Sequence, residues 1–152
     1  MIKMSINDII IRYNFISKIL FKDKDTSLSK DLKIKIMTIR IEYGKVNKTF
    51  EEDVQEFAKG IVEERFKELS VKIDKTEEEI KEFNELVSKY NNETNDYISK
   101  YIQNEVEVNE YNFTKSEFDE IVSVNSDNNV NINNNDIEAP DFLEAIYDLF
   151  VK

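Results

Sequence analysis

The scarcity of glycine and proline is the feature of this sequence that most restricts its fold. Among the 152 residues, the only ones of these two types are Gly44, Gly60 and Pro140. Sandwiches and barrels of β-strands need many such residues in their turns, so the sequence favours helices joined by few tight turns. A chain of this length can bury roughly 70% of the surface that its unfolded form exposes. We therefore expect one mainly α domain that spans residues 1–152.

Apolar residues at helical spacing predict a helical bundle of about five to six helices. The first helix is expected from Ser5 to Leu20, and a helix capped by Ser29 is expected to stop at Gly44. Pro140 suits the first turn of a closing helix. Three capping boxes are expected to begin the helices in between, namely Thr49 with Glu52, Thr76 with Glu79, and Thr114 with Glu117.

Three segments alternate apolar and polar residues in the way that is typical of strands. Residues 105–109 predict a short extended or β segment. Residues 33–42 fit a helical face and also fit a strand, so an α+β alternative stays open there. The Asn-rich run 125–136 predicts a surface loop. A small hairpin near 130–137 is the alternative, because Asn tolerates the left-handed conformation that tight hairpins need.

The residue types that are missing exclude several kinds of chemistry. The chain has no Cys and no His, which removes thiol nucleophiles, disulfides, Cys/His zinc sites and the usual general base near neutral pH. Asp127, Asn129, Asn131 and Glu138 have the spacing of calcium ligands, but Ile132 stands where that loop needs glycine. We therefore predict no catalytic residue, no metal site and no cofactor, and we expect that the protein is not an enzyme.

Runs of carboxylates are the one remaining route to hydrolysis with a divalent ion. They occur at 51–53, 63–64 and 77–79. Acidic residues favour the first turn of a helix, where the partial positive charge of the helix dipole stabilises them. We therefore interpret these runs as helix starts and solvated faces, and the hydrolase hypothesis ranks last.

A net charge of −11 restricts the partners. Repulsion from phosphate groups predicts no direct binding to nucleic acid and none to an anionic membrane. No apolar run reaches the ~20 residues that span a bilayer. The apolar start of the chain lacks the cleavage site of a signal peptide.

Five features follow one another along the chain. They are an apolar helix like Ile6 to Leu20, a Ser-initiated helix like Ser29 to Tyr43, a central acidic helical region, the alternating Glu105-Val106-Glu107-Val108, and a closing stretch from Ala139 to Phe150. In this order the chain resembles an uncharacterised family of small acidic proteins encoded by tailed phages of AT-rich genome. The resemblance covers nearly the whole chain. It implies an accessory or virion-associated protein, found in the host cytoplasm or the virion, without established catalytic residues.

Binding to another protein is therefore the predicted function. The first hypothesis is a non-enzymatic virion-associated or assembly protein that binds a phage structural protein or a host protein, and a homo-oligomer fits this hypothesis. The alternative is an acidic inhibitor of a host defence or nucleic-acid enzyme that imitates nucleic acid charge. This alternative ranks second because lysines interleave with acids along the centre of the chain. The predicted contact residues are Tyr97, Tyr101, Glu105, Glu107 and Tyr111.

Overall fold

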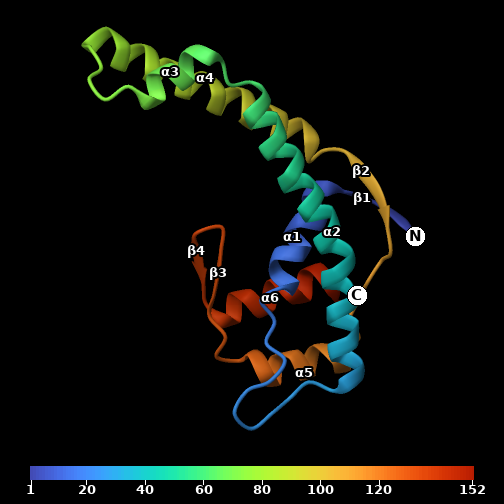
Figure 1. The fold of residues 1–152 in the computed structure, drawn as a ribbon. Helices are drawn as coiled ribbons and strands as arrows, with labels where there is room; N and C mark the ends of the chain where they lie inside the picture. The colour runs from blue at the N-terminus through green and yellow to red at the C-terminus, as the bar shows by residue number, and fades with distance from the viewer. The chain divides into compact units, whose positions relative to one another are not determined.

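The computed structural model describes residues 1–152 and confirms a mainly α architecture with short strands. Six helices and two antiparallel sheets of two strands each occur along the chain (Figure 1). In order they are β1 (Ile2–Ser5), α1 (Ile6–Ile16), α2 (Lys30–Gly60), α3 (Glu64–Val71), α4 (Glu77–Tyr101), β2 (Glu105–Val108), α5 (Lys115–Asn125), β3 (Val130–Ile132), β4 (Asn135–Ile137) and α6 (Ala139–Phe150). No helix combines the length and apolar character needed to cross a membrane.

The chain divides into two compact units, and the sequence pattern predicts neither boundary. Unit 1 comprises Met1–Asn47 and Glu105–Lys152, and unit 2 comprises Lys48–Asn104. The two units are described separately below.

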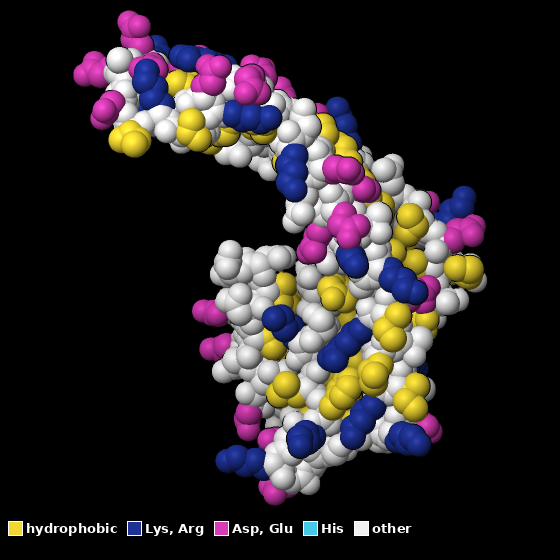
Figure 2. Space-filling model, in the orientation of Figure 1, with side chains coloured by type: hydrophobic (Ala, Val, Ile, Leu, Met, Phe, Trp, Pro, Cys, Tyr) yellow, Lys and Arg dark blue, Asp and Glu magenta, His cyan; other side chains and the backbone are white.

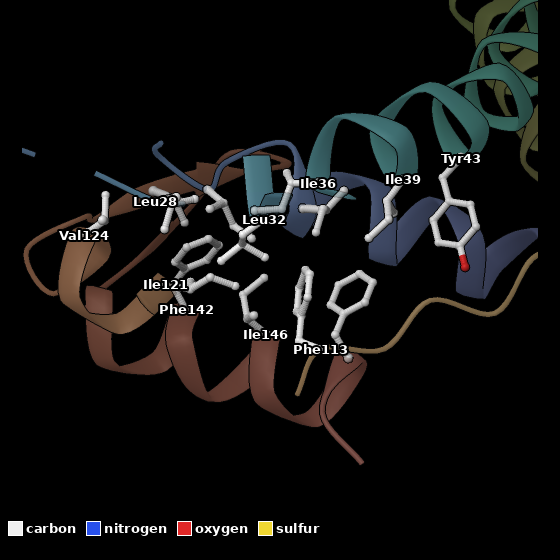
Figure 3. Close-up of a cluster of buried hydrophobic side chains, with 14 of the residues drawn as sticks. Leu28, Leu32, Ile36, Ile39, Tyr43, Phe113, Ile121, Val124, Phe142 and Ile146 are labelled. Atoms are coloured by element: carbon white, nitrogen blue, oxygen red, sulfur yellow. The ribbon is translucent and has the colours of Figure 1, made fainter. Parts of the chain in front are cut away.

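The core of unit 1 lies between α2 and α6. Ile36 and Ile39 of α2 enter it from one side, and Phe142 and Ile146 of α6 enter it from the other (Figure 3). All four side chains are completely buried, and each contributes about 1.5–3 kcal/mol to folding. This contact fixes which side of each helix faces the interior and which side is left on the surface.

A single helix replaces the two that the sequence predicts between residues 30 and 60. The segment 33–42 is helical, so the strand alternative there is wrong. The expected stop at Gly44 is also wrong, because the helix runs on to Gly60. A Cβ built on Gly44 would lie only 3.0 Å from Cε1 of the Tyr13 ring. The glycine thus permits close packing of Tyr13, which offsets the cost of about 1 kcal/mol that glycine has in a helix interior.

The capping pair expected at Thr49 and Glu52 also lies inside α2, so no helix starts there. The other two capping boxes are confirmed. The hydroxyl of Thr76 accepts the Glu79 N–H at 3.2 Å, and that of Thr114 accepts the Glu117 N–H at 3.1 Å. The Thr49–Glu52 pair is only a local signal, and no residue nearby breaks the preceding helix. Tertiary packing on both halves of α2 therefore outweighs it.

The extended segment predicted near 105–109 is confirmed as β2, and its partner is a strand that the sequence analysis missed. β1 and β2 are antiparallel, with Ile2 opposite Val108 and Met4 opposite Val106. Those four apolar side chains pack against the core of unit 1. Ser5 then caps α1, because its hydroxyl accepts the Asp8 N–H at 3.1 Å. α1 ends at Ile16 and is therefore shorter than the predicted helix.

The alternative of a small hairpin near 130–137 is confirmed. β3 and β4 pair through a two-residue turn in which Asn133 has φ 52° and Asn134 has φ 65°. Two positive φ angles are typical of a type I′ turn, whose twist matches that of paired strands. Val130 and Ile132 bury their side chains in the core of unit 1. The run 125–136 is therefore a hairpin for much of its length, which corrects the expectation of a plain surface loop.

Asn125 is the only buried polar residue of the protein and belongs to the last turn of α5. Its Oδ1 accepts the N–H of Leu20 at 2.8 Å, and its Nδ2 donates to the carbonyl oxygens of Leu20 and Ile121 at 3.2 and 2.9 Å. Its Oδ1 also accepts from Nδ2 of Asn128 at 2.9 Å. This side chain therefore completes the hydrogen bonds of the backbone that follows α1.

Unit 2 is held together by stacked rings between helices. Phe57 of α2 lies parallel to Tyr97 of α4, with ring centroids 4.1 Å apart and an angle of 4° between the planes. Phe66 of α3 stacks on Phe83 of α4 with centroids 5.1 Å apart. Aromatic pairs of this kind contribute about 0.5–1.5 kcal/mol beyond the area they bury. They compensate for a unit whose only fully buried aliphatic side chain is Leu69.

We expect Asn125→Ala to lower the free energy of unfolding by about 2–3 kcal/mol, because the N–H and C=O of Leu20 would lose their partner. Urea denaturation followed by circular dichroism measures the loss. Asn131→Ala is the control, since its side chain is exposed and bonds only to Asp136. An equal loss in both variants would contradict the role assigned to Asn125.

The start of α4 should respond to acid through Glu79. The hydrogen bonds from Lys72 and from the Thr76 backbone lower the pKa of Glu79 to about 2 from its usual 4.5. A lowered pKa means that the stabilisation is complete above the usual value and is lost as the pH falls towards about 2. NMR titration of the Glu79 carboxyl should show this low midpoint. Lys72→Met should raise it towards 4.5, and an unchanged midpoint would contradict the assignment.

Candidate interaction surface

Two of the predicted contact residues, Tyr97 and Tyr101, lie together on α4 in unit 2. Their ring centroids are 5.8 Å apart. The Tyr97 ring stacks on Phe57, and the Tyr101 hydroxyl donates to Asp53 at 2.6 Å. Burial and this bond to Asp53 raise the pKa of Tyr101 to about 12, so the hydroxyl is a donor at neutral pH. Both side chains are half-buried and take part in the packing of unit 2.

The other three predicted contact residues lie in unit 1. Glu105 and Glu107 are exposed on β2, opposite Ser5 and Lys3. Tyr111 is half-buried, and its hydroxyl donates to the carboxylate of Glu42. All five residues remain predicted contact residues.

A small hollow of unit 1 gathers polar groups beside Tyr111. Its walls include Arg12, Tyr43, Glu110 and Lys152. Burial raises the pKa of Tyr43 to about 12, and the bonded Lys152 lowers the pKa of Glu110 below its usual value. Both shifts move away from neutral pH, so neither group is poised to exchange a proton there. The hollow therefore offers hydrogen bonds and charges for binding.

The residues near 130 that have the spacing of calcium ligands form hydrogen bonds within the chain. Oδ1 of Asn129 accepts the N–H of Ala139 at 2.9 Å, and Nδ2 of Asn131 donates to Asp136 at 2.8 Å. Asn129 thus ties the hairpin to the start of α6, and Asn131 joins the two strands of the hairpin. No group of three or more acidic side chains is close enough together to hold a metal ion.

The largest uncovered apolar feature of unit 1 is the outer side of α2. Ile34, Met37 and Ile41 have 52%, 49% and 59% of their surface exposed. They follow one another at intervals of three and four residues, so they lie in one row on the side away from the core. Lys30 and Lys45 extend this row at its two ends and are also exposed. We call these five residues the α2 stripe.

The apolar residues of the stripe belong to the segment 33–42, whose pattern fits both a strand and a helix. Ile34 alternates with Ile36, and Ile39 with Ile41, in the manner of a strand, while Ile36 and Ile39 also fit one face of a helix. In the structure Ile36 and Ile39 are buried, whereas the other two isoleucines are exposed on the opposite side of one helix. A helix with apolar residues on both sides needs a covering for each of them. The exposed isoleucines are therefore the signal by which this second apolar side of α2 could have been recognised.

Charge within unit 1 is separated along the chain, which the sequence analysis did not recognise. Residues 1–47 contain 10 Lys and Arg against 5 Asp and Glu, a net charge of +5. Residues 105–152 contain 2 against 12, a net charge of −10. Figure 2 shows hydrophobic side chains lying among Lys and Arg side chains over α2 in unit 1. The α2 stripe thus belongs to the basic part of an acidic protein.

Comparison of the chain with family models, with curated proteins and with solved structures gave no match.

If the α2 stripe is uncovered in the folded chain, its residues should tolerate charge. We expect Ile41→Asp to change the free energy of unfolding by less than about 0.5 kcal/mol. The neighbouring Ile39→Ala should lower it by about 2–5 kcal/mol, because it removes a completely buried side chain. Urea denaturation compares the two variants directly. A loss in Ile41→Asp as large as that in Ile39→Ala would mean that α2 buries both sides.

Proposed function

We propose that this protein is a non-enzymatic binding protein that docks another protein on the α2 stripe. The observation that carries the proposal is the row of Ile34, Met37 and Ile41, each about half exposed. Single apolar residues on a surface are normal, whereas aligned ones keep water in contact with a continuous apolar strip. Removing that strip from water provides a driving force of about 25 cal/mol for each Å² buried.

The lysines at the two ends of the stripe define the chemistry of the partner. Neither Lys30 nor Lys45 forms an ion pair within the chain. A partner with an apolar centre and carboxylates near its edges therefore satisfies the whole stripe. Charges at the rim of such a contact act mainly on specificity and on the rate of association.

The resemblance to small acidic phage proteins supports a role for this binding in a phage-infected cell. In that setting the partner is a phage structural protein or a host protein, and the chain acts in the virion or in assembly. The pKa shifts in the hollow of unit 1, which move away from neutral pH, support binding over acid–base catalysis.

Inhibition of a basic host enzyme is the second candidate function. It is favoured by the acidic residues in 105–152, of which only Glu110 and Glu117 form ion pairs. Of the remaining ten, Glu120 and Asp136 accept hydrogen bonds from Ser29 and Asn131. The net charge of +5 on residues 1–47 limits such mimicry to one part of the surface, so this function ranks second.

Capture from extracts of phage-infected bacteria tests the first candidate. We expect the immobilised full-length chain to retain a protein that the double variant Ile34→Asp with Ile41→Asp does not retain. The substitutions place carboxylates in the apolar row, which opposes both the burial and the charge of the acidic partner. Mass spectrometry of the retained proteins provides the measurement.

The matched control is Val71→Asp with Ile73→Asp, which changes two exposed apolar residues of unit 2 by the same charge. It should retain the same protein as the unchanged chain. A protein retained equally by all three forms, or lost with the control alone, would exclude the α2 stripe as its docking site. A protein lost only with Glu144→Lys and Asp148→Lys would favour the inhibitor function.

A further inference from the structure

The outer side of α6 carries a second uncovered surface, opposite in charge to the α2 stripe. Asp141, Glu144, Tyr147 and Asp148 are all exposed and lie within three turns of the helix. None of the three carboxylates forms an ion pair, and Tyr147 keeps 47% of its surface exposed. We call these four residues the α6 face. Its centre is aromatic and its surroundings are acidic.

Tyr147 is held in place by a neighbouring ring. Its ring meets that of Phe118 from α5 edge to face, with centroids 5.2 Å apart and an angle of 68° between the planes. Phe118 is itself half-buried. A tyrosine that is already ordered loses little side-chain freedom on binding, which is one reason that tyrosine is common at binding hot spots.

The two surfaces lie on opposite sides of unit 1 and cannot meet within it. Figure 3 shows the core side chains of α2 and α6 pointing toward one another between the two helices. The α2 stripe and the α6 face are on the sides of those helices that point away from this core. Each surface is therefore uncovered in the single chain.

We propose that the partner docked on the α2 stripe is a second copy of this chain, which presents its α6 face. This proposal rests on the proposed function and names its partner. The aromatic ring of Tyr147 would pack on the row of Ile34, Met37 and Ile41. The carboxylates around it would meet Lys30 and Lys45, whose long side chains can reach inward.

The apolar row of the α2 stripe and the α6 face agree in length. With a rise of about 1.5 Å per residue, the row from Ile34 to Ile41 is about 10 Å long, and so is the stretch from Asp141 to Asp148. Lys30 and Lys45 lie about 6 Å beyond the two ends of this row, so their side chains must point inward to meet the carboxylates. The match in length accompanies the match in charge between a basic-ended stripe and an acidic face. A contact between two different surfaces of identical chains is heterologous, so it continues from copy to copy and produces a ring or an open filament.

The ionic conditions for such an assembly follow from the charge of the whole chain. Each copy carries −11, so long-range repulsion opposes assembly at low salt. At about 0.15 M salt, charges further apart than about 8 Å are largely screened, whereas direct contacts are screened less. Assembly should therefore be measured near physiological ionic strength.

The test uses two charge-reversal variants of the full-length chain. Variant one carries Lys30→Glu with Lys45→Glu and keeps only its α6 face. Variant two carries Glu144→Lys with Asp148→Lys and keeps only its α2 stripe. Sedimentation velocity over a concentration series should show assemblies larger than a dimer for the unchanged chain. Each variant alone should associate at least about tenfold more weakly.

Mixing the variants gives the decisive result. The intact α6 face of variant one should bind the intact α2 stripe of variant two, and the pair should stop at a 1:1 dimer because each remaining surface is defective. The control, Lys24→Glu with Lys81→Glu, reverses two exposed lysines elsewhere and should assemble like the unchanged chain.

Three outcomes would overturn self-association. They are an unchanged chain that stays monomeric at every concentration, variants that assemble as the unchanged chain does, and a mixture that forms no dimer. A monomeric chain whose binding to phosphatidylglycerol vesicles is lost in variant one would assign the stripe to a membrane instead. A monomeric chain that still captures a protein through Ile34 and Ile41 would overturn self-association and leave the proposed function standing.

Discussion

The burial of one side of α2 against α6 is the contact on which unit 1 depends. Ile36, Ile39, Phe142 and Ile146 are all removed from water completely. Once this contact forms, the orientation of α2 is settled. Its remaining apolar side chains must then lie on the outside, because side chains on opposite sides of a helix cannot share one core.

The same constraint leaves the apolar side chains that the proposed function uses for binding on the surface. Ile34, Met37 and Ile41 add nothing to the core, and exposure of a continuous apolar row carries a risk of non-specific association. In the proposed function, the lysines at its ends select among partners, since a partner without carboxylates would leave them unpaired. In the proposed contact, the separation of charge between residues 1–47 and 105–152 provides a basic and an acidic surface on the same unit.

Unit 2 follows different rules. Its interior is made of stacked rings, such as Phe57 on Tyr97, and of tyrosine hydroxyls that bond to neighbouring groups. Many of its carboxylates pair with Lys or Arg, as Glu82 does with Arg65 at 2.8 Å. At least seven of its 15 carboxylates form ion pairs within the unit, whereas none of the three on the α6 face forms one. Unit 1 therefore carries the larger share of carboxylates without an ion pair.

The sequence by itself determined the elements whose signals are local. The scarcity of glycine and proline favoured a helical fold, the Thr76 and Thr114 boxes marked two helix starts, and Asn133-Asn134 permitted a tight hairpin, because each acts through its own backbone. Tertiary structure alone decided that α2 runs through Gly44, where Tyr13 packs close. It also decided that β1 pairs with β2, although about a hundred residues separate them. In the same way it decided that Ile34 faces outward while Ile36 faces inward. Those outcomes depend on which distant side chains compete for the same buried space, and spacing along one chain does not contain that information.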